Sequence, residues 1–143
     1  MRKTVLVVDD QKEARSLVCH ALRSRYDIRE AGDFREAAEA AAAGPVDLVL
    51  LDLHLPPEPD SPSEGVRIHR LLRERFPAVP VVVLTADESP EVRRDLEGRG
   101  VEGYLTKPFD PARLLEVVDA LAAGRGEIGR GAERAGRKEG EVR

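Results

Sequence analysis

Short apolar runs alternate along the chain with longer segments in which apolar side chains recur every three or four positions. Runs rich in leucine and β-branched residues are typical of buried strands, and the longer spacing is typical of amphipathic helices. The pattern predicts five strands, at about residues 5–8, 26–30, 47–51, 79–84 and 101–105. It also predicts five helices, at about residues 12–25, 34–43, 64–76, 90–98 and 111–123.

Turn and cap residues mark the ends of several of these segments. Asp33 and Glu36 have the spacing of a capping box at the start of the second helix, and Gly44-Pro45 ends it. In the first helix, the apolar face is expected to consist of Ala14, Leu17, Val18, Ala21 and Leu22.

A helix after every strand favours parallel strands with helices on both faces of the sheet. The predicted fold class is therefore α/β, a doubly wound five-stranded parallel sheet in a (βα)5 sandwich. Neither GxGxxG nor GxxxxGK[ST] follows any expected strand, so the dinucleotide-binding and P-loop interpretations lose their main support.

Composition adds few constraints. The expected domain spans residues 1–123, and residues 124–143, rich in Gly, Arg and Glu, are expected to form a disordered tail. The net charge of −4 gives no electrostatic argument for binding nucleic acid or a membrane surface, and no apolar run is long enough to span a membrane. The single cysteine, Cys19, excludes an internal disulfide and favours a cytoplasmic location; its helical position indicates a buried small hydrophobic residue.

Candidate chemistry comes from the polar residues that follow the expected strands. Asp9 and Asp10 follow the first strand, Asp52 the third, Thr85 the fourth and Lys107 the fifth. Because sites in open parallel sheets form at the carboxyl ends of the strands, these side chains are expected to meet at one edge. For Asp9 or Asp10 alone, a helix cap is an equally good interpretation.

Three neighbouring carboxylates repel one another, and their ionised form favours a cation. Hard oxygen ligands suit Mg²⁺, and the chain has no His or Cys spacing typical of zinc. Beside such an ion, an aspartate can act as a nucleophile and form an acyl phosphate. Lys107 and Thr85 can then offer a positive charge and a hydroxyl donor to the phosphoryl group.

Four segments in this order resemble the response-regulator receiver domains of two-component signalling, which have the CheY-like fold. They are Val7-Val8-Asp9-Asp10, Leu50-Leu51-Asp52-Leu53-His54-Leu55-Pro56, Leu84-Thr85-Ala86 and Tyr104-Leu105-Thr106-Lys107-Pro108-Phe109. The resemblance extends over about residues 3–123 and implies the flavodoxin-like receiver fold.

The resemblance also implies a phosphorylation site. Asp52 would take a phosphoryl group from the phosphohistidine of a histidine kinase. Asp10, Asp52 and the backbone carbonyl of His54 would ligate Mg²⁺ directly, and Asp9 would act partly through water.

The remaining expectations from the resemblance concern the switch. Thr85 and Lys107 would bind the phosphoryl group, and the Lys107-Pro108 bond would be cis. Thr85 would move toward the phosphate and Tyr104 would turn inward, so that the face of the fourth helix, fifth strand and fifth helix changes for partner binding.

The expected partners are a sensor histidine kinase or phosphotransfer protein and an unidentified output partner, with homodimer formation as an option. Such a phosphoprotein is not an enzyme beyond its own phosphorylation and dephosphorylation. The alternatives are a receiver-like interaction module that is not phosphorylated and a fragment of a larger transcriptional regulator. An aspartyl phosphatase is disfavoured, because His54 stands where those enzymes place a second aspartate.

The chain departs from the family pattern after Asp52. Gly65 comes later than expected, and residues 56–64 contain four prolines. This insertion is either a harmless longer loop or a segment that shapes access to the site. The side chains of His54 and Asp87 are expected at the periphery of the site, whereas His20 and His69 are interpreted as structural or solvated.

Overall fold

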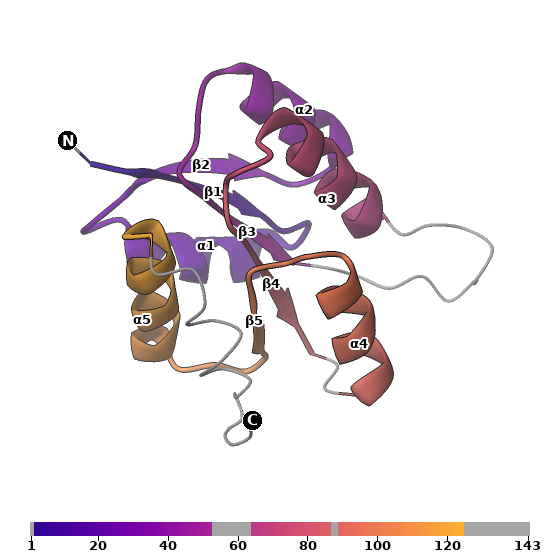
Figure 1. Cartoon of the computed structure of the whole chain (residues 1–143). Helices are drawn as coiled ribbons and strands as arrows, with labels where there is room; N and C mark the ends of the chain where they lie inside the picture. The colour runs from indigo at the N-terminus through magenta and orange to yellow at the C-terminus, as the bar shows by residue number, and fades with distance from the viewer. Residues whose placement is uncertain (1, 53–63, 87–88, 125–143) are drawn as a thin grey trace. The chain divides into compact units, whose positions relative to one another are not determined.

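The structure is a computed structural model that describes residues 2–52, 64–86 and 89–124. Strands and helices alternate through the chain, as the apolar pattern predicts (Figure 1). In chain order they are β1 (Thr4–Val8), α1 (Lys12–Leu22), β2 (Asp27–Ala31), α2 (Phe34–Ala42), β3 (Leu48–Asp52), α3 (Glu64–Arg75), β4 (Val81–Thr85), α4 (Pro90–Gly98), β5 (Gly103–Thr106) and α5 (Pro111–Ala122).

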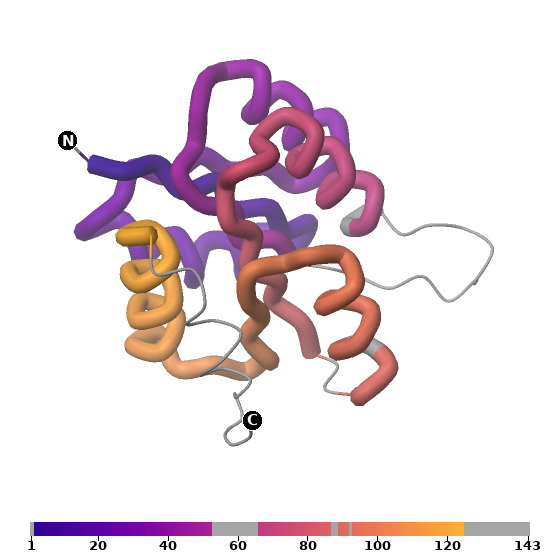
Figure 2. Tube along the Cα trace, in the orientation of Figure 1, coloured from indigo at the N-terminus to yellow at the C-terminus, as the bar shows by residue number. Residues whose placement is uncertain are grey.

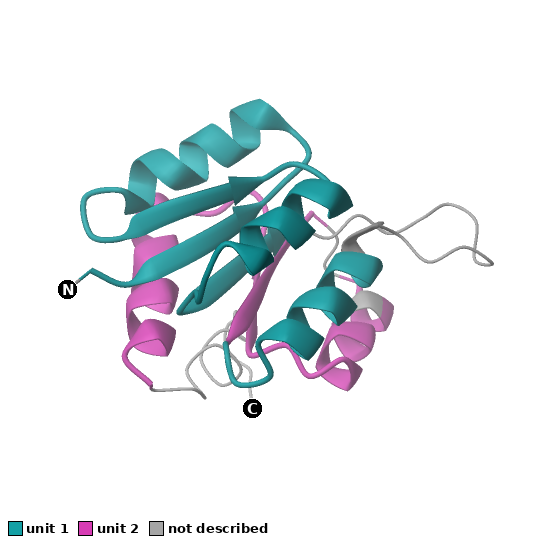
Figure 3. Cartoon of the chain, turned by 90° about the horizontal axis from the view of Figure 1, so that it is seen from above, with its two compact units in different colours: residues 1–79 teal, residues 80–143 magenta. Residues whose placement is uncertain are grey.

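The chain forms two compact units, residues 1–79 and 80–143 (Figure 3). In the first unit β1 lies between β2 and β3, and both pairings are parallel, with Val5 opposite Ile28 on one side and Leu48 on the other. In the second unit β4 and β5 are parallel, with Val82 opposite Gly103. The predicted parallel arrangement is thus present in each unit.

Helices cover both faces of the strands within each unit. In the first unit α2 and α3 lie together on one face, and α1 lies on the other (Figure 1). In the first unit the trace runs from β1 through α1 to β2 and from β2 through α2 to β3 (Figure 2). In the second unit α4 and α5 lie on the two sides of the β4–β5 pair (Figure 1). No helix in the described ranges is long and apolar enough to cross a membrane.

The core of the first unit is built around β1 and β3. The apolar residues of β1 and β3 are almost completely buried, among them Leu6, Leu48 and Leu50. Burying each leucine contributes roughly 1.5–3 kcal/mol, so these strands fix the positions of whatever follows them. β2 is less buried, and only Ala31 of its residues is fully covered.

Helix α1 corrects two expectations. It ends at Leu22, with Arg23 as C-cap, rather than continuing to residue 25. Its buried residues are Val18, Cys19 and Leu22, whereas Leu17 is 74% exposed. At about 100° per residue, Leu17 lies on the far side of the helix from this buried face. The prediction that Leu17 belongs to the apolar face was therefore wrong.

The expected cap of α2 is present in a shifted form. Asp33 is the N-cap, and its Oδ1 accepts a hydrogen bond of 2.8 Å from the Glu36 N–H. The Glu36 carboxylate accepts instead from the Gly32 N–H, at 2.6 Å, one residue before the N-cap. After the helix, Gly44 has a φ of 147°, a conformation that favours glycine, and the helix stops there as predicted.

Candidate functional site

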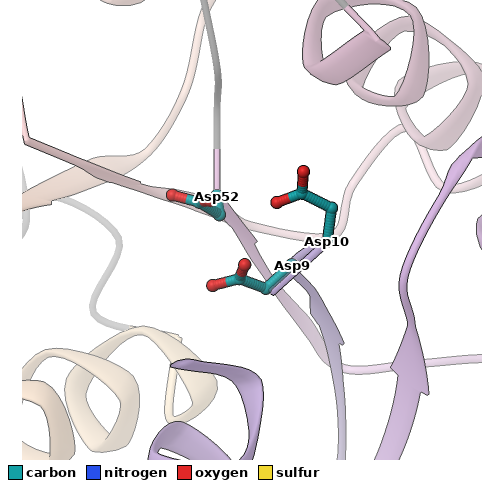
Figure 4. Close-up of side chains that lie close together, drawn as sticks. All are labelled: Asp9, Asp10 and Asp52. Carbon is teal, nitrogen blue, oxygen red and sulfur yellow. The ribbon is translucent and has the colours of Figure 1, made fainter. Parts of the chain in front are cut away.

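The three aspartates predicted from the strand ends gather within the first unit. Asp9 and Asp10 directly follow β1, and Asp52 is the last residue of β3. Val8 pairs with Leu51, so the carboxyl ends of the two strands are adjacent. One carboxylate oxygen from each aspartate lies within 4.8 Å of the others (Figure 4).

Burial differs among the three side chains. Asp9 is 2% exposed and Asp52 is 8% exposed, whereas Asp10 is open to solvent. A buried carboxylate is costly unless hydrogen bonds or a cation compensate for the lost hydration. Asp9 Oδ1 accepts a hydrogen bond of 2.9 Å from the Gln11 N–H, and the Asp9 N–H donates to the Ala31 carbonyl at 3.0 Å. The N-cap of α1 is Gln11, so Asp9 supports the start of the helix without being its cap.

This donor set fits a small divalent cation. The cluster offers only carboxylate oxygens, which are hard ligands, and its open side at Asp10 leaves room for water or a substrate oxygen. Mg²⁺ is bound in this way, by one or two carboxylates together with waters and phosphate oxygens. The three residues are therefore compatible with the predicted Mg²⁺ site.

The second unit brings Thr85 and Lys107 together at the ends of its two strands. Thr85, the last residue of β4, pairs with Thr106 of β5. The Lys107 N–H donates a hydrogen bond of 2.7 Å to the Thr85 carbonyl. The Lys107-Pro108 bond is cis, as the family resemblance implied. Thr85 is buried and Lys107 is half-buried.

Tyr104 of β5 has a buried side chain. The Arg93 guanidinium of α4 lies over its ring, with 5.6 Å between the guanidinium carbon and the ring centroid. This cation–π contact links α4 to the side chain that was predicted to turn inward. The switch role of Tyr104 stays a prediction.

Some predictions fall outside the described residues. They concern His54, most of the proline-rich loop 56–64, Asp87 and the tail beyond residue 124. His20 is exposed and His69 is buried, in line with their interpretation as solvated or structural.

Cys19 is buried, as its helical position indicated. Burial, helped by the nearby Glu30 carboxylate, raises the pKa of its thiol to about 11. Because the thiolate is the reactive form, Cys19 stays protonated and unreactive at neutral pH.

Two residues near the cluster were not anticipated. Arg15 of α1 donates from Nη1 to the Asp9 carbonyl at 2.6 Å, and Gly32 lies beside it without a side chain. A signal for Arg15 was present in the sequence. With Val18, Cys19 and Leu22 it has the spacing of one helix face, so a charged residue occupies the buried stripe.

Comparisons with known proteins agree with this geometry. The family model described as the response regulator receiver domain matches residues 5–119. The transcriptional regulatory protein PhoP of Bacillus subtilis, described as acting in alkaline phosphatase synthesis, is 36% identical over 123 residues, which are 85% of this chain. The chain spans about half of that relative's length, 49%.

Solved structures show the same fold. The chemotaxis protein CheY4 of Vibrio cholerae has a TM-score of 0.72 and 30% identity, covering 83% of this chain and 98% of that one. The BeF3-activated receiver domain of DrrB, a Thermotoga maritima response regulator, has a TM-score of 0.74 and 26% identity, covering 86% and 99% of the two chains. The predicted five-stranded, doubly wound α/β fold is thereby confirmed. The chain belongs to the response regulator receiver domain family of two-component signalling.

Proposed function

We propose that the chain is a phosphorylated receiver in which Asp52 is the phosphoacceptor. The observation that carries this proposal is the cluster of Asp9, Asp10 and Asp52, whose ligand oxygens lie within 4.8 Å of one another at the ends of β1 and β3. A carboxylate nucleophile beside two further carboxylates can support Mg²⁺-dependent phosphoryl transfer to an aspartate.

The phosphoryl donor is a phosphohistidine of a sensor histidine kinase or a phosphotransfer protein. A carboxylate oxygen of Asp52 forms a bond to phosphorus as the phosphorus–nitrogen bond breaks. The imidazole nitrogen keeps the electron pair and takes up a proton, and an acyl phosphate is left on Asp52. Asp52 suits this role because its backbone is fixed at the end of the buried strand β3.

The residues that would hold the metal are Asp9, Asp10, Asp52 and the backbone carbonyl of His54. Bound Mg²⁺ supplies positive charge that neutralises the phosphoryl oxygens. The hydrogen bond from the Gln11 N–H orients the Asp9 carboxylate. Asp10 is exposed, so its charged carboxylate keeps most of its hydration. His54 enters through the family resemblance alone.

Thr85 and Lys107 would contact the phosphoryl group carried by Asp52. Their adjacency within the second unit supports a shared role, with Lys107 supplying positive charge and Thr85 a hydroxyl donor. Movement of Thr85 and Tyr104 would then change the α4–β5–α5 face for an output partner. The similar DrrB receiver has a BeF3-activated form, which supports the existence of an activated state.

The phosphorylated receiver acts on an output partner that the sequence does not identify. Formation of a homodimer is one way in which it could act. A fragment of a larger transcriptional regulator is a second hypothesis, favoured by the half-length match to PhoP. We expect a cytoplasmic location in either case, because the proposed phosphoryl donor is a phosphohistidine of a signalling kinase or phosphotransfer protein.

Intact-mass measurement tests the proposed function. The full chain is incubated with acetyl phosphate or with phosphoramidate, a donor with a phosphorus–nitrogen bond, in Mg²⁺ or in excess chelator. We expect the mass of one added phosphoryl group in Mg²⁺ and almost none in chelator. Incorporation that persists in chelator would contradict the metal-dependent mechanism. No incorporation from either donor, in folded protein that binds Mg²⁺, would favour the interaction-module alternative.

A further inference from the structure

Arg15 is a charged residue on the buried face of α1. Its side chain is 16% exposed, and it shares that face with Val18, Cys19 and Leu22. Ordering and partly burying an arginine is costly unless its donors are satisfied by well-placed acceptors. The position of Arg15 therefore calls for a specific set of contacts.

Those contacts reach the turn that carries two of the clustered aspartates. Nε donates to Glu30 Oε1 at 2.9 Å, which orients the guanidinium from β2. Nη1 donates to the Asp9 carbonyl at 2.6 Å. That carbonyl belongs to the same planar peptide group as the Asp10 N–H. Arg15 thus fixes the orientation of the peptide plane that contains the Asp10 N–H.

Gly32, the residue after β2, makes room for this guanidinium. A Cβ at position 32 would lie 3.1 Å from Arg15 Nη1, 3.2 Å from Glu36 Oε1 and 3.8 Å from the Asp9 carbonyl oxygen. The Gly32 N–H in turn donates to Glu36 Oε1 at 2.6 Å. The arginine is therefore held between the β1–α1 and β2–α2 turns.

We propose that Arg15 is a positioning residue for the metal-binding carboxylates. It holds the Asp9–Asp10 peptide in the orientation that keeps Asp10 in the cluster, and Gly32 keeps that approach open. The inference rests on the proposed function, because it assigns the positioning to a Mg²⁺ site. It explains why an arginine occupies a buried stripe otherwise suited to an apolar residue.

The competing interpretation is a simple ion pair with Glu30, whose side chain is 48% exposed. Exposed pairs contribute little to stability, and loss of such a pair would leave metal binding unchanged. Arg35 and Glu39 of α2 form an ion pair of this kind, 2.7 Å long and with both side chains exposed. Arg35→Met is therefore the matched control for Arg15→Met.

The test compares Mg²⁺ affinity, measured by titration calorimetry, with the free energy of unfolding in urea. Arg15→Met is expected to weaken Mg²⁺ binding about tenfold, the scale seen when residues that support metal ligands are removed. Arg15→Lys should recover part of the affinity, because a lysine can still donate to the Asp9 carbonyl. Arg35→Met should bind as the native protein does.

Gly32→Ala provides an independent test with Arg15 intact. Its Cβ would crowd the guanidinium, so Mg²⁺ affinity should fall in the same direction as in Arg15→Met. In both variants the amide NMR signal of Asp10 should shift in the metal-free protein. If Arg15→Met does not fold, Arg15→Lys and Gly32→Ala carry the test.

The outcomes separate the two claims. Native protein that binds no Mg²⁺ would overturn both the proposed function and the positioning role. Native protein that binds Mg²⁺, with unchanged affinity in Arg15→Met and Gly32→Ala, would overturn the positioning role alone. A loss of unfolding free energy without a loss of affinity would likewise reduce Arg15 to a structural residue.

Discussion

Asp52→Asn is expected to reduce phosphoryl incorporation to background in the presence of Mg²⁺. The amide has nearly the shape of the carboxylate but lacks the anionic oxygen that attacks phosphorus. The substitution therefore removes the nucleophile while leaving the end of β3 close to its native form. A time course of intact mass with acetyl phosphate measures the effect, and we expect no added phosphoryl group over the interval in which native protein is fully modified.

Asp27→Asn is the matched control for this substitution. Asp27 is exposed at the amino end of β2, away from the carboxyl ends of the strands, and pairs with Arg2 at 3.2 Å. The Asp27→Asn protein should be phosphorylated at the native rate. Labelling of Asp52→Asn at a comparable rate would mean that another residue is the nucleophile, with Asp9 and Asp10 the first to be examined.

Asp52→Asn is also expected to stabilise the protein in metal-free buffer. Two unit charges 4.8 Å apart repel by about 3.5 kcal/mol at an effective dielectric constant of about 20. The carboxylate oxygens of the cluster lie within this distance, solvent at the exposed Asp10 weakens the repulsion, and Asp52→Asn removes one of the three charges. We expect the free energy of unfolding in chelator to rise by about 1–3 kcal/mol. Urea unfolding of the native and substituted proteins measures this change.

In Mg²⁺ the order should reverse, and the native protein should be more stable than Asp52→Asn. The ion binds the folded native protein and stabilises it in proportion to the logarithm of its concentration above the dissociation constant. Asp52→Asn loses one ligand, so its gain should be smaller. In chelator, the free energy of unfolding of Asp27→Asn should not rise above that of the native protein, since this substitution removes an exposed ion pair with Arg2. Destabilisation of Asp52→Asn in chelator would show that the clustered carboxylates do not repel as described.

The apolar pattern predicted every strand and helix of the described residues. A continuous apolar run can be buried on both faces as a strand, and apolar residues at helical spacing can be buried together on one face of a helix. Boundaries were less certain where local chemistry decides them. The fourth strand was expected from residue 79 but begins at Val81. The Val79 N–H donates to the Phe76 carbonyl, in the turn after α3, and Pro80 has no N–H for a strand ladder.

The acidic cluster could be predicted because strand ends determine it: three aspartates at the carboxyl ends of parallel strands had to approach one another. The helical spacing marks Arg15 as a charged residue on the buried stripe, but the contacts of Arg15 and Gly32 could not be predicted. They join two turns that are far apart in sequence. The exposure of Leu17 was missed for a related reason. The helical spacing allowed it on the apolar face, and only packing showed which side of α1 is buried.

The central claim, an acyl phosphate on Asp52, is tested most directly on the native protein. The Mg²⁺-dependent phosphorylated form is reduced with borohydride, which converts an aspartyl phosphate to homoserine, and the peptides are then sequenced by mass spectrometry. We predict homoserine at position 52 and unmodified aspartate at positions 9 and 10. Homoserine at another aspartate, or phosphate that survives reduction on a serine or threonine, would contradict the assignment of Asp52 as the phosphoacceptor.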